Sequence, residues 1–303
     1  MNAPIDSIKL NFSTDSLWLL NLCLAVIMFG VALNLSLSDF RNVMKTPKAS
    51  LVGVLSQFVV LPALTFVLIW IIKPQPSIAI GMMMVAACPG GNISNFMSHL
   101  SKANVALSVS LTAIASVLAI FMTPLNLKIW ASLYPPTATL LHEISLDHMD
   151  VFKAVAVLLG IPLILGMSFR QWKPKSAELL SKWLKPISIL IFIGFVVIAF
   201  GNNFEIFLDY FQYIVFIVFI HNGIAFLSGF TFARLSGLSF LDQKAITIET
   251  GIQNSGLGLL LIFTFFQGLG GMAIVAAWWG IWHIISGLTL SFFWSRVKPA
   301  ATA

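Results

Sequence analysis

Charged residues are scarce in this chain. Of its 303 residues only 9% are charged, 58% are hydrophobic, and the mean hydropathy is +0.95. A soluble domain carries about a quarter of its residues as charged groups, because its surface must be hydrated. The composition therefore excludes a soluble protein and predicts an integral, multi-span membrane protein. A net charge of +6 on so few charged groups does not indicate a nucleic-acid partner.

Cysteine and the common catalytic motifs are also lacking. The two cysteines, Cys23 and Cys88, lie among apolar residues and match no disulfide or metal-binding spacing. No P-loop, H-E-x-x-H motif or pair of intramembrane aspartates is present, which argues against a membrane-embedded enzyme. No basic leader precedes the first apolar run and no A-x-A site follows it, so this run is predicted to remain in the membrane.

Long apolar windows are what the chain has in abundance. They predict nine transmembrane helices joined by short polar connections, and no soluble domain interrupts them. Residues 1–303 are thus predicted to form a single membrane unit with the lipid bilayer around it. The predicted spans are Leu17–Leu35, Ala49–Ile72, Ser77–His99, Ala103–Ile129, Val151–Phe169, Lys185–Phe200, Ile206–Phe232, Gln243–Phe266 and Gly271–Phe293.

The few charges follow a pattern along this series of spans. If the C-terminus is cytoplasmic, 13 of the 17 basic residues fall in inner connections and seven of the 11 acidic residues fall outside. Cytoplasmic loops of membrane proteins carry such an excess of Lys and Arg. The N-terminus is predicted outside and the C-terminus inside, in the cell (inner) membrane.

One carboxylate is placed at membrane depth. Glu249 lies a short way into the eighth predicted span, where a charged side chain costs about 3 kcal/mol even on a lenient insertion scale. No Lys or Arg lies well inside any predicted span to pair with it. The partner must be a bound cation, a proton, or a histidine such as His221 or His283. We favour a bound metal cation.

Two predicted spans contain helix-breaking stretches. Residues 88–95 in the third span read CPGGNISN, and residues 249–258 in the eighth read ETGIQNSGLG. A proline kink or close packing of glycines is the simpler interpretation of each stretch alone. Oxygen-bearing side chains beside both favour two unwound helices instead, and such a pair in corresponding halves is typical of inverted-repeat transporters. The predicted fold is therefore an all-α inverted-repeat secondary transporter with two discontinuous, crossing helices.

Neighbouring spans supply further oxygen atoms. Gln57 lies in the second span, and Ser108 and Thr112 lie four residues apart in the fourth, on one helix face. Amide, hydroxyl, carboxylate and carbonyl oxygens are ligands for a hard cation such as sodium. A membrane Ser or Thr more often bonds its own helix, so the hydroxyl pair alone leaves both roles open.

These motifs resemble those of the bile acid:sodium symporter family. The likeness rests on GGNISN at 90–95, ETGIQNSG at 249–256 and WHIISG at 282–287, and it runs from about Leu17 to Trp294. It implies a core domain of approximately 49–134 and 206–294, and a panel domain of approximately 17–35 and 151–200. Ten-span members begin with a helix that this chain lacks, so the chain resembles the nine-span form.

The resemblance also implies a set of binding residues around two sodium ions. Substrate is expected near Asn92, Asn254 and His283. The family commonly has a small residue at the position of Asn92 and Asn at the position of Ile284. The resemblance therefore defines the substrate less closely than the ion sites. The first sodium site is expected to use Ser94, Asn95, Ser108, Thr112 and Glu249. The second is expected to use Gln57, Glu249 and Gln253, with backbone oxygens near Thr250 and Ile252.

The function predicted from these features is import of a small or amphipathic organic anion driven by sodium. A bile acid, a sulfated steroid, or a pantoate- or pyruvate-like acid fits the resemblance, and no obligate protein partner is inferred. One alternative is coupling to protons through Glu249, for which the additional non-titrating ligands would be unnecessary. A passive channel is a second alternative.

Overall fold

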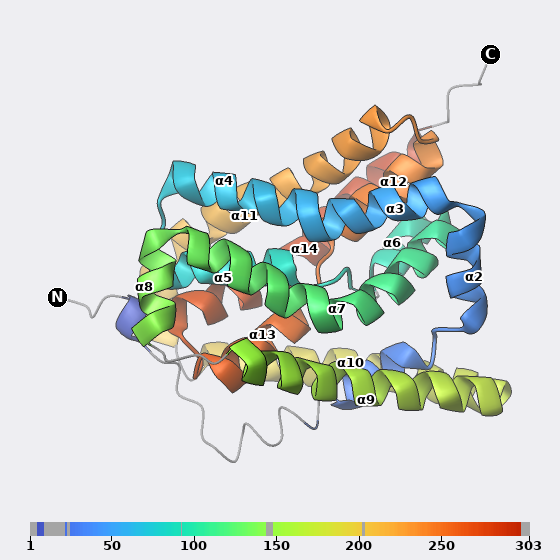
Figure 1. Ribbon diagram of the computed structural model, residues 1–303, viewed down its shortest axis with the longest axis horizontal. Helices are drawn as coiled ribbons and strands as arrows, with labels where there is room; N and C mark the ends of the chain where they lie inside the picture. The colour runs from blue at the N-terminus through green and yellow to red at the C-terminus, as the bar shows by residue number, and fades with distance from the viewer. Residues whose placement is uncertain are drawn as a thin grey trace.

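The predicted all-α membrane fold is confirmed. The computed structural model describes residues 5–8, 22, 25–91, 93–143, 148–201 and 204–297, and within these ranges the regular elements are all helical. The long helices lie side by side along one direction (Figure 1). The elements are η1 (Ile5–Ser7), α2 (Leu37–Lys45), α3 (Pro47–Leu55), η2 (Ser56–Val60), α4 (Leu61–Ile72), α5 (Pro76–Ala87), α6 (Ile93–Leu100), α7 (Val105–Leu133), α8 (Pro135–Glu143), α9 (His148–Trp172), α10 (Pro174–Gly201), α11 (Phe204–Leu235), α12 (Phe240–Gly251), α13 (Ser255–Phe265) and α14 (Gly270–Arg296).

The helices lie where the apolar windows predict spans. Within the described ranges, five continuous helical stretches are long and apolar enough to cross a membrane, and α5 and α13 are shorter apolar helices. The predicted sixth span lies within α10. Of the first predicted span, the structure describes Leu22 and residues 25–35, of which 25–32 are helical, and the rest lies outside the described residues. The number of nine spans therefore stays a prediction.

The third and eighth predicted spans are each divided into two helices. The third is α5 followed by α6, and the division follows from Pro89, because a proline disfavours helical backbone at the residue before it. Cys88 accordingly has an extended backbone (φ −72°, ψ 155°). The eighth is α12 followed by α13, and Asn254 begins the second half by accepting a hydrogen bond from the Leu257 amide at 3.1 Å.

The second span contains a local change of helix type. A π-helical turn, η2, separates α3 from α4 and contains Gln57. Pro62 follows in the first turn of α4 and has no amide hydrogen to donate, which weakens the α-helical ladder in the preceding turn. Such π-turns are frequent at functional sites.

Helices α5 and α14 approach each other closely at the centre of the bundle. A Cβ atom added at Gly81 would lie 2.8 Å from the Cα of Met272, and one at Gly271 would lie 2.1 Å from Ser77 Oγ. Residues of η1 cover the start of this helix pair: the Asp6 carboxylate accepts from the Ser77 amide at 2.7 Å. The close contact holds α5 and α13, one half of each divided helix, in one cluster of buried apolar side chains together with α14.

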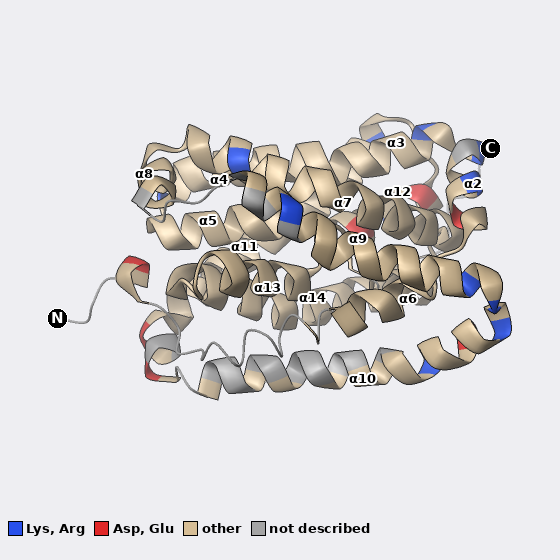
Figure 2. Cartoon of the chain, turned by 60° about the horizontal axis from the view of Figure 1, so that its bottom comes forward, with Lys and Arg blue, Asp and Glu red and all other residues tan. Residues whose placement is uncertain are grey.

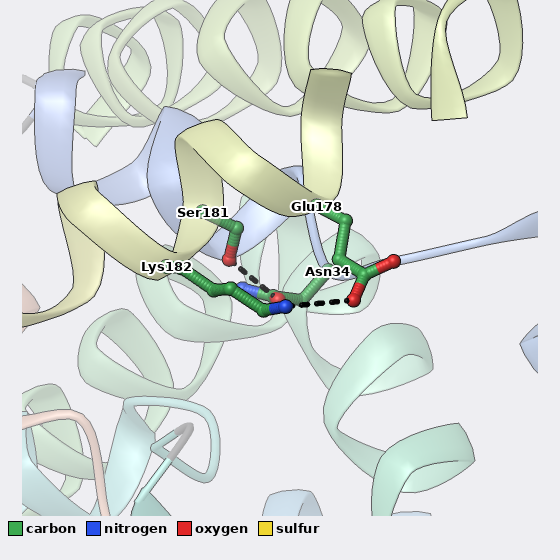
Figure 3. A network of polar contacts seen from close by, with 4 residues as sticks. All are labelled: Asn34, Glu178, Ser181 and Lys182. Atoms are coloured by element: carbon green, nitrogen blue, oxygen red, sulfur yellow. Dashed lines mark hydrogen bonds and ion pairs between the residues drawn. The ribbon is translucent and has the colours of Figure 1, made fainter. Parts of the chain in front are cut away.

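Basic side chains gather at one end of the bundle. Figure 2 shows Lys and Arg around α2, the turn between α9 and α10, and the C-terminal end of the chain. At this same end the first span contacts α10, where Asn34 Oδ1 accepts from Ser181 Oγ at 2.6 Å. Beside it Lys182 pairs with Glu178 at 3.1 Å, four residues away on the exposed face of the helix (Figure 3).

The contact between α5 and α14 gives a prediction about stability. Gly81→Ala places a methyl group against the backbone of Met272, so we expect a loss on the order of 1–3 kcal/mol. The measurement is the apparent melting temperature of the detergent-purified protein. Gly160→Ala is the matched control, because its added Cβ would meet only Ile120 Cδ1 at an ordinary 3.7 Å. Equal melting temperatures for both variants would contradict the close approach.

Candidate cation site

The interruptions of the two divided helices contact each other directly. The Gly91 amide donates to the Ile252 carbonyl at 2.8 Å, and the Asn254 amide donates to the Pro89 carbonyl at 2.8 Å. Together they form a short antiparallel bridge between Gly90 and Gln253. The unwound backbone of one helix therefore satisfies the unwound backbone of the other, as buried polar groups require. The predicted pair of discontinuous helices is thus observed, and the halves meet at their breaks.

Glycine is required at the centre of this contact. A Cβ atom at Gly90 would lie 2.7 Å from Glu249 Oε2 and 3.1 Å from Gln57 Oε1. The Gly90 amide instead donates to Gln57 Oε1 at 3.0 Å. The bare backbone lets the carboxylate of the eighth span and the amide of the second approach the break together.

Glu249 is fully buried and surrounded by hydroxyl groups. Its relative exposure is 0%, and it accepts hydrogen bonds from Ser94 on α6 and from Ser108 and Thr112 on α7. The Ser108 contact is 2.6 Å and the Thr112 contacts to both carboxylate oxygens are 3.1 Å. Asn95 Oδ1 lies 2.9 Å from Ser108 Oγ and 3.2 Å from Thr112 Oγ1. The structure therefore brings together all five side chains expected at the first site.

This cluster holds more oxygen contacts than protons. Six contacts of 3.2 Å or less join the hydroxyls to Glu249 and Asn95. Three hydroxyl groups supply three protons, since each hydroxyl donates one. The six contacts therefore share three protons, and the Thr112 hydroxyl also lies 3.1 Å from the Ser108 carbonyl oxygen of its own helix. A small cation coordinated by these oxygens would satisfy the lone pairs that the three protons do not reach.

The electrostatic setting of Glu249 also favours a cation. The residue lies in the last turn of α12, where the carbonyl ends of the helix carry partial negative charge. Among the described residues, no Lys, Arg or His forms an ion pair with its carboxylate. His221 is excluded as a direct partner, because its Nε2 lies 2.7 Å from Thr65 Oγ1 and its Nδ1 has no hydrogen-bond partner. The negative charge is therefore left to a bound cation or a proton.

The residues expected at the second sodium site also lie beside Gly90. Gln57 and Gln253 are both fully buried, and Gln253 Nε2 donates to the Thr250 carbonyl at 2.8 Å. Gln57 Nε2 and Gln253 Oε1 have no hydrogen-bond partner. The Ile252 carbonyl accepts from Gly91 and retains one lone pair. The unpaired Gln253 Oε1 is an oxygen that a second cation would satisfy, since buried polar atoms normally have a partner.

The residues expected near substrate are less clearly grouped. Asn92 lies outside the described residues. The side-chain oxygen of Asn254, Oδ1, caps the N-terminus of α13. Only the Nδ2 group of this side chain is therefore left to contact a ligand. His283 on α14 is 6% exposed, and its Nδ1 has no hydrogen-bond partner. No hydrogen bond between described residues joins Asn254 to His283.

Sequence reasoning missed three residues beside the breaks, two of which donate to the last carbonyls of α5 and α12. Thr123 on α7 donates to Ala87 O, the last carbonyl of α5, at 2.8 Å. Asn222 on α11 donates to Gly251 O, the last carbonyl of α12, at 2.8 Å. Ser56 Oγ and Thr250 Oγ1 lie 2.8 Å apart. Asn222 had a detectable signal, since an amide in an apolar span needs a partner, whereas the hydroxyls looked like ordinary helix residues.

Comparison with known proteins agrees with this architecture. Residues 21–210 match the Sodium Bile acid symporter family. The chain is 35% identical to the uncharacterized sodium-dependent transporter YocS of Bacillus subtilis, over 95% of this chain and 88% of that protein. It is 30% identical to the probable chloroplastic sodium/metabolite cotransporter BASS1 of Arabidopsis thaliana, over 91% of this chain and 66% of that protein.

A more distant human relative extends the same pattern. The ileal sodium/bile acid cotransporter is 27% identical over 78% of this chain and 67% of that protein. These three relatives are named as transporters that use sodium. Together with the all-helical fold and its two interrupted helices, these matches show that the chain belongs to the sodium bile acid symporter family of integral membrane transporters.

Proposed function

We propose that this protein imports an organic anion together with sodium by alternating access. The observation that carries the proposal is the fully buried Glu249 carboxylate in a cluster with fewer protons than oxygen contacts. Unwound segments of transporter helices supply such ion sites near the membrane midplane. The sodium-dependent relatives support sodium as the ion.

The charge of the site limits the substrate. One carboxylate with two sodium ions leaves a local charge of +1, which a monoanionic substrate neutralises. The N-termini of α6 and α13 carry partial positive charge at the break and favour an anion there. The substrate class is a small or amphipathic organic acid: bile acid, sulfated steroid, or pantoate- or pyruvate-like acid. The relatives named for metabolites and bile acid agree with this range.

Access is proposed to change by movement of the core against the panel. The core is approximately 49–134 and 206–294, and the panel is approximately 17–35 and 151–200. The contacts of Asn34 with Ser181 and of Gly166 with Ala32 support a panel in which the first span packs against α9 and α10. The panel also packs on Ala113 of α7 in the core, so this contact is the one that would have to slide. The basic end of the bundle is proposed to face the cytoplasm, which leaves the N-terminus outside.

Transport into proteoliposomes tests the function. A labelled monoanionic acid is expected to accumulate when sodium is imposed outside, and with two sodium ions each cycle moves one positive charge inward. An inside-negative potential then adds about 2.3 kcal/mol per 100 mV. Glu249→Gln is expected to abolish sodium-driven accumulation. Uptake driven by a pH gradient without sodium would favour the proton alternative, and uptake without accumulation would indicate a channel.

The hydroxyl groups separate sodium coupling from proton coupling. Ser108→Ala and Thr112→Val each remove one oxygen from the cluster, so we expect half-saturating sodium to rise about tenfold or more. Sodium-dependent thermal stabilisation of the purified protein measures this. Ser110→Ala is the matched control, because Ser110 is buried on the same helix but its hydroxyl bonds the Ala106 carbonyl. An unchanged sodium response in all three variants would place the ion elsewhere.

The number of sodium sites is tested through Gln57. With two coupled sites, wild-type uptake is expected to depend on sodium with a Hill coefficient above 1. Gln57→Leu removes an oxygen from the second group and leaves the contacts of Glu249 with Ser94, Ser108 and Thr112 intact. We expect the coefficient to fall to about 1 with sodium dependence retained. A wild-type value of 1 that the substitution does not alter would contradict two coupled sites.

A further inference from the structure

Asn222 joins three helices at the broken end of α12. The residue lies on α11, has 0% exposure, and donates through Nδ2 to the Gly251 carbonyl at 2.8 Å. Its Oδ1 accepts from Ser286 Oγ on α14 at 2.6 Å. The two partners fix the orientation of the amide, because a flipped side chain would place its oxygen against the Gly251 carbonyl oxygen.

Helix α11 packs closely against α12 near this contact. A Cβ atom at Gly251 would lie 2.2 Å from the ring of Phe226, one turn after Asn222. A Cβ atom at Gly229 would lie 3.0 Å from Thr247 Cα and 3.0 Å from Thr250 Cβ. There is thus little space for the end of α12 to shift toward α11, and the Asn222 amide is the group that sets how the Gly251 peptide is turned.

The peptide that Asn222 holds lies between the backbone oxygens proposed as sodium ligands. Gly251 directly follows Thr250 and directly precedes Ile252, and Glu249 is two residues earlier on the same helix end. A rotation of the Gly251 carbonyl away from Asn222 would turn the adjoining peptides with it. Partners of this kind, which hold a ligand rather than touch the ion, typically change metal affinity 10–100-fold when removed, about the scale expected here.

The other partner of Asn222 leads toward the expected substrate position. Ser286 lies one turn after His283 on α14, and its hydroxyl is also 3.3 Å from the His283 carbonyl oxygen. Since one hydroxyl has one proton, the shorter contact to Asn222 is the donated bond. The chain of contacts therefore runs from the sodium side of the break, through Asn222 and Ser286, to the helix that carries His283.

We infer that Asn222 is a positioning residue that holds the interrupted end of α12 in its sodium-binding form and links it to α14 through Ser286. This inference rests on the proposed sodium coupling. Asn222 does not touch the ion. It sets the direction of the backbone oxygens around Gly251, and Ser286 sets the direction of the Asn222 amide.

The experiment measures sodium-dependent thermal stabilisation of the detergent-purified full chain, with choline chloride keeping the salt concentration constant. Asn222→Ala is expected to raise half-saturating sodium about tenfold. Ser286→Ala should raise half-saturating sodium by less than Asn222→Ala does. Ser286→Thr should give the wild-type value, because threonine keeps the hydroxyl group. The double variant should be no weaker than Asn222→Ala alone, since Ser286 acts through Asn222. In proteoliposomes the apparent KM for sodium should rise while the maximal rate at saturating sodium is retained.

Ser228→Ala is the matched control on the same helix. Its buried hydroxyl bonds the Ala225 carbonyl within α11, so its sodium response should equal that of the wild type. A merely structural role for Asn222 would lower the melting temperature without sodium and leave half-saturating sodium unchanged, which would overturn the inference. If Asn222→Ala does not fold, Ser286→Ala and Ser286→Thr provide the test. Equal half-saturating sodium in these two variants would then overturn the inference. A wild type that shows no sodium response would instead contradict the proposed function itself.

Discussion

The fold depends on keeping a buried carboxylate at the end of an interrupted helix. Glu249 lies in the last turn of α12, where the helix dipole opposes a negative charge, and it is completely shielded from solvent. Three hydroxyls and an amide oxygen surround it. A carboxylate in apolar surroundings is costly unless polar groups or a cation compensate its charge. Helices α6 and α7 therefore present their hydroxyl groups to it.

The broken backbone is stable because its polar groups are satisfied from several directions. The two breaks bond to each other across Gly90 and Gln253. At the helix ends, Thr123 of α7 donates to the last carbonyl of α5, and Asn222 of α11 donates to the last carbonyl of α12. An unsatisfied buried carbonyl would cost about 1–3 kcal/mol, so these contacts make an unwound segment compatible with the membrane interior.

The sequence was informative where the residue itself dictates the backbone or is expensive in lipid. Pro89 predicted the first break, Glu249 predicted a buried charge, and the apolar windows predicted the helix positions. The joining of Ser94 and Asn95 to Glu249 came from the family resemblance, because spacing alone does not show which helices are neighbours. The roles of Asn222, Thr123 and the π-turn at Gln57 depend on tertiary contacts that no local pattern records. Pro62 was the available signal for that turn.

The central claim is that a sodium ion lies among the oxygens around Glu249. An experimental structure determined in sodium chloride and again in choline chloride tests it most directly. The account predicts density in sodium alone, coordinated by oxygens of Ser94, Asn95, Ser108, Thr112 and Glu249, with the α12 break better ordered than in choline. Identical density in both salts, with the hydroxyls bonded to a protonated carboxyl group and no ion between them, would contradict it.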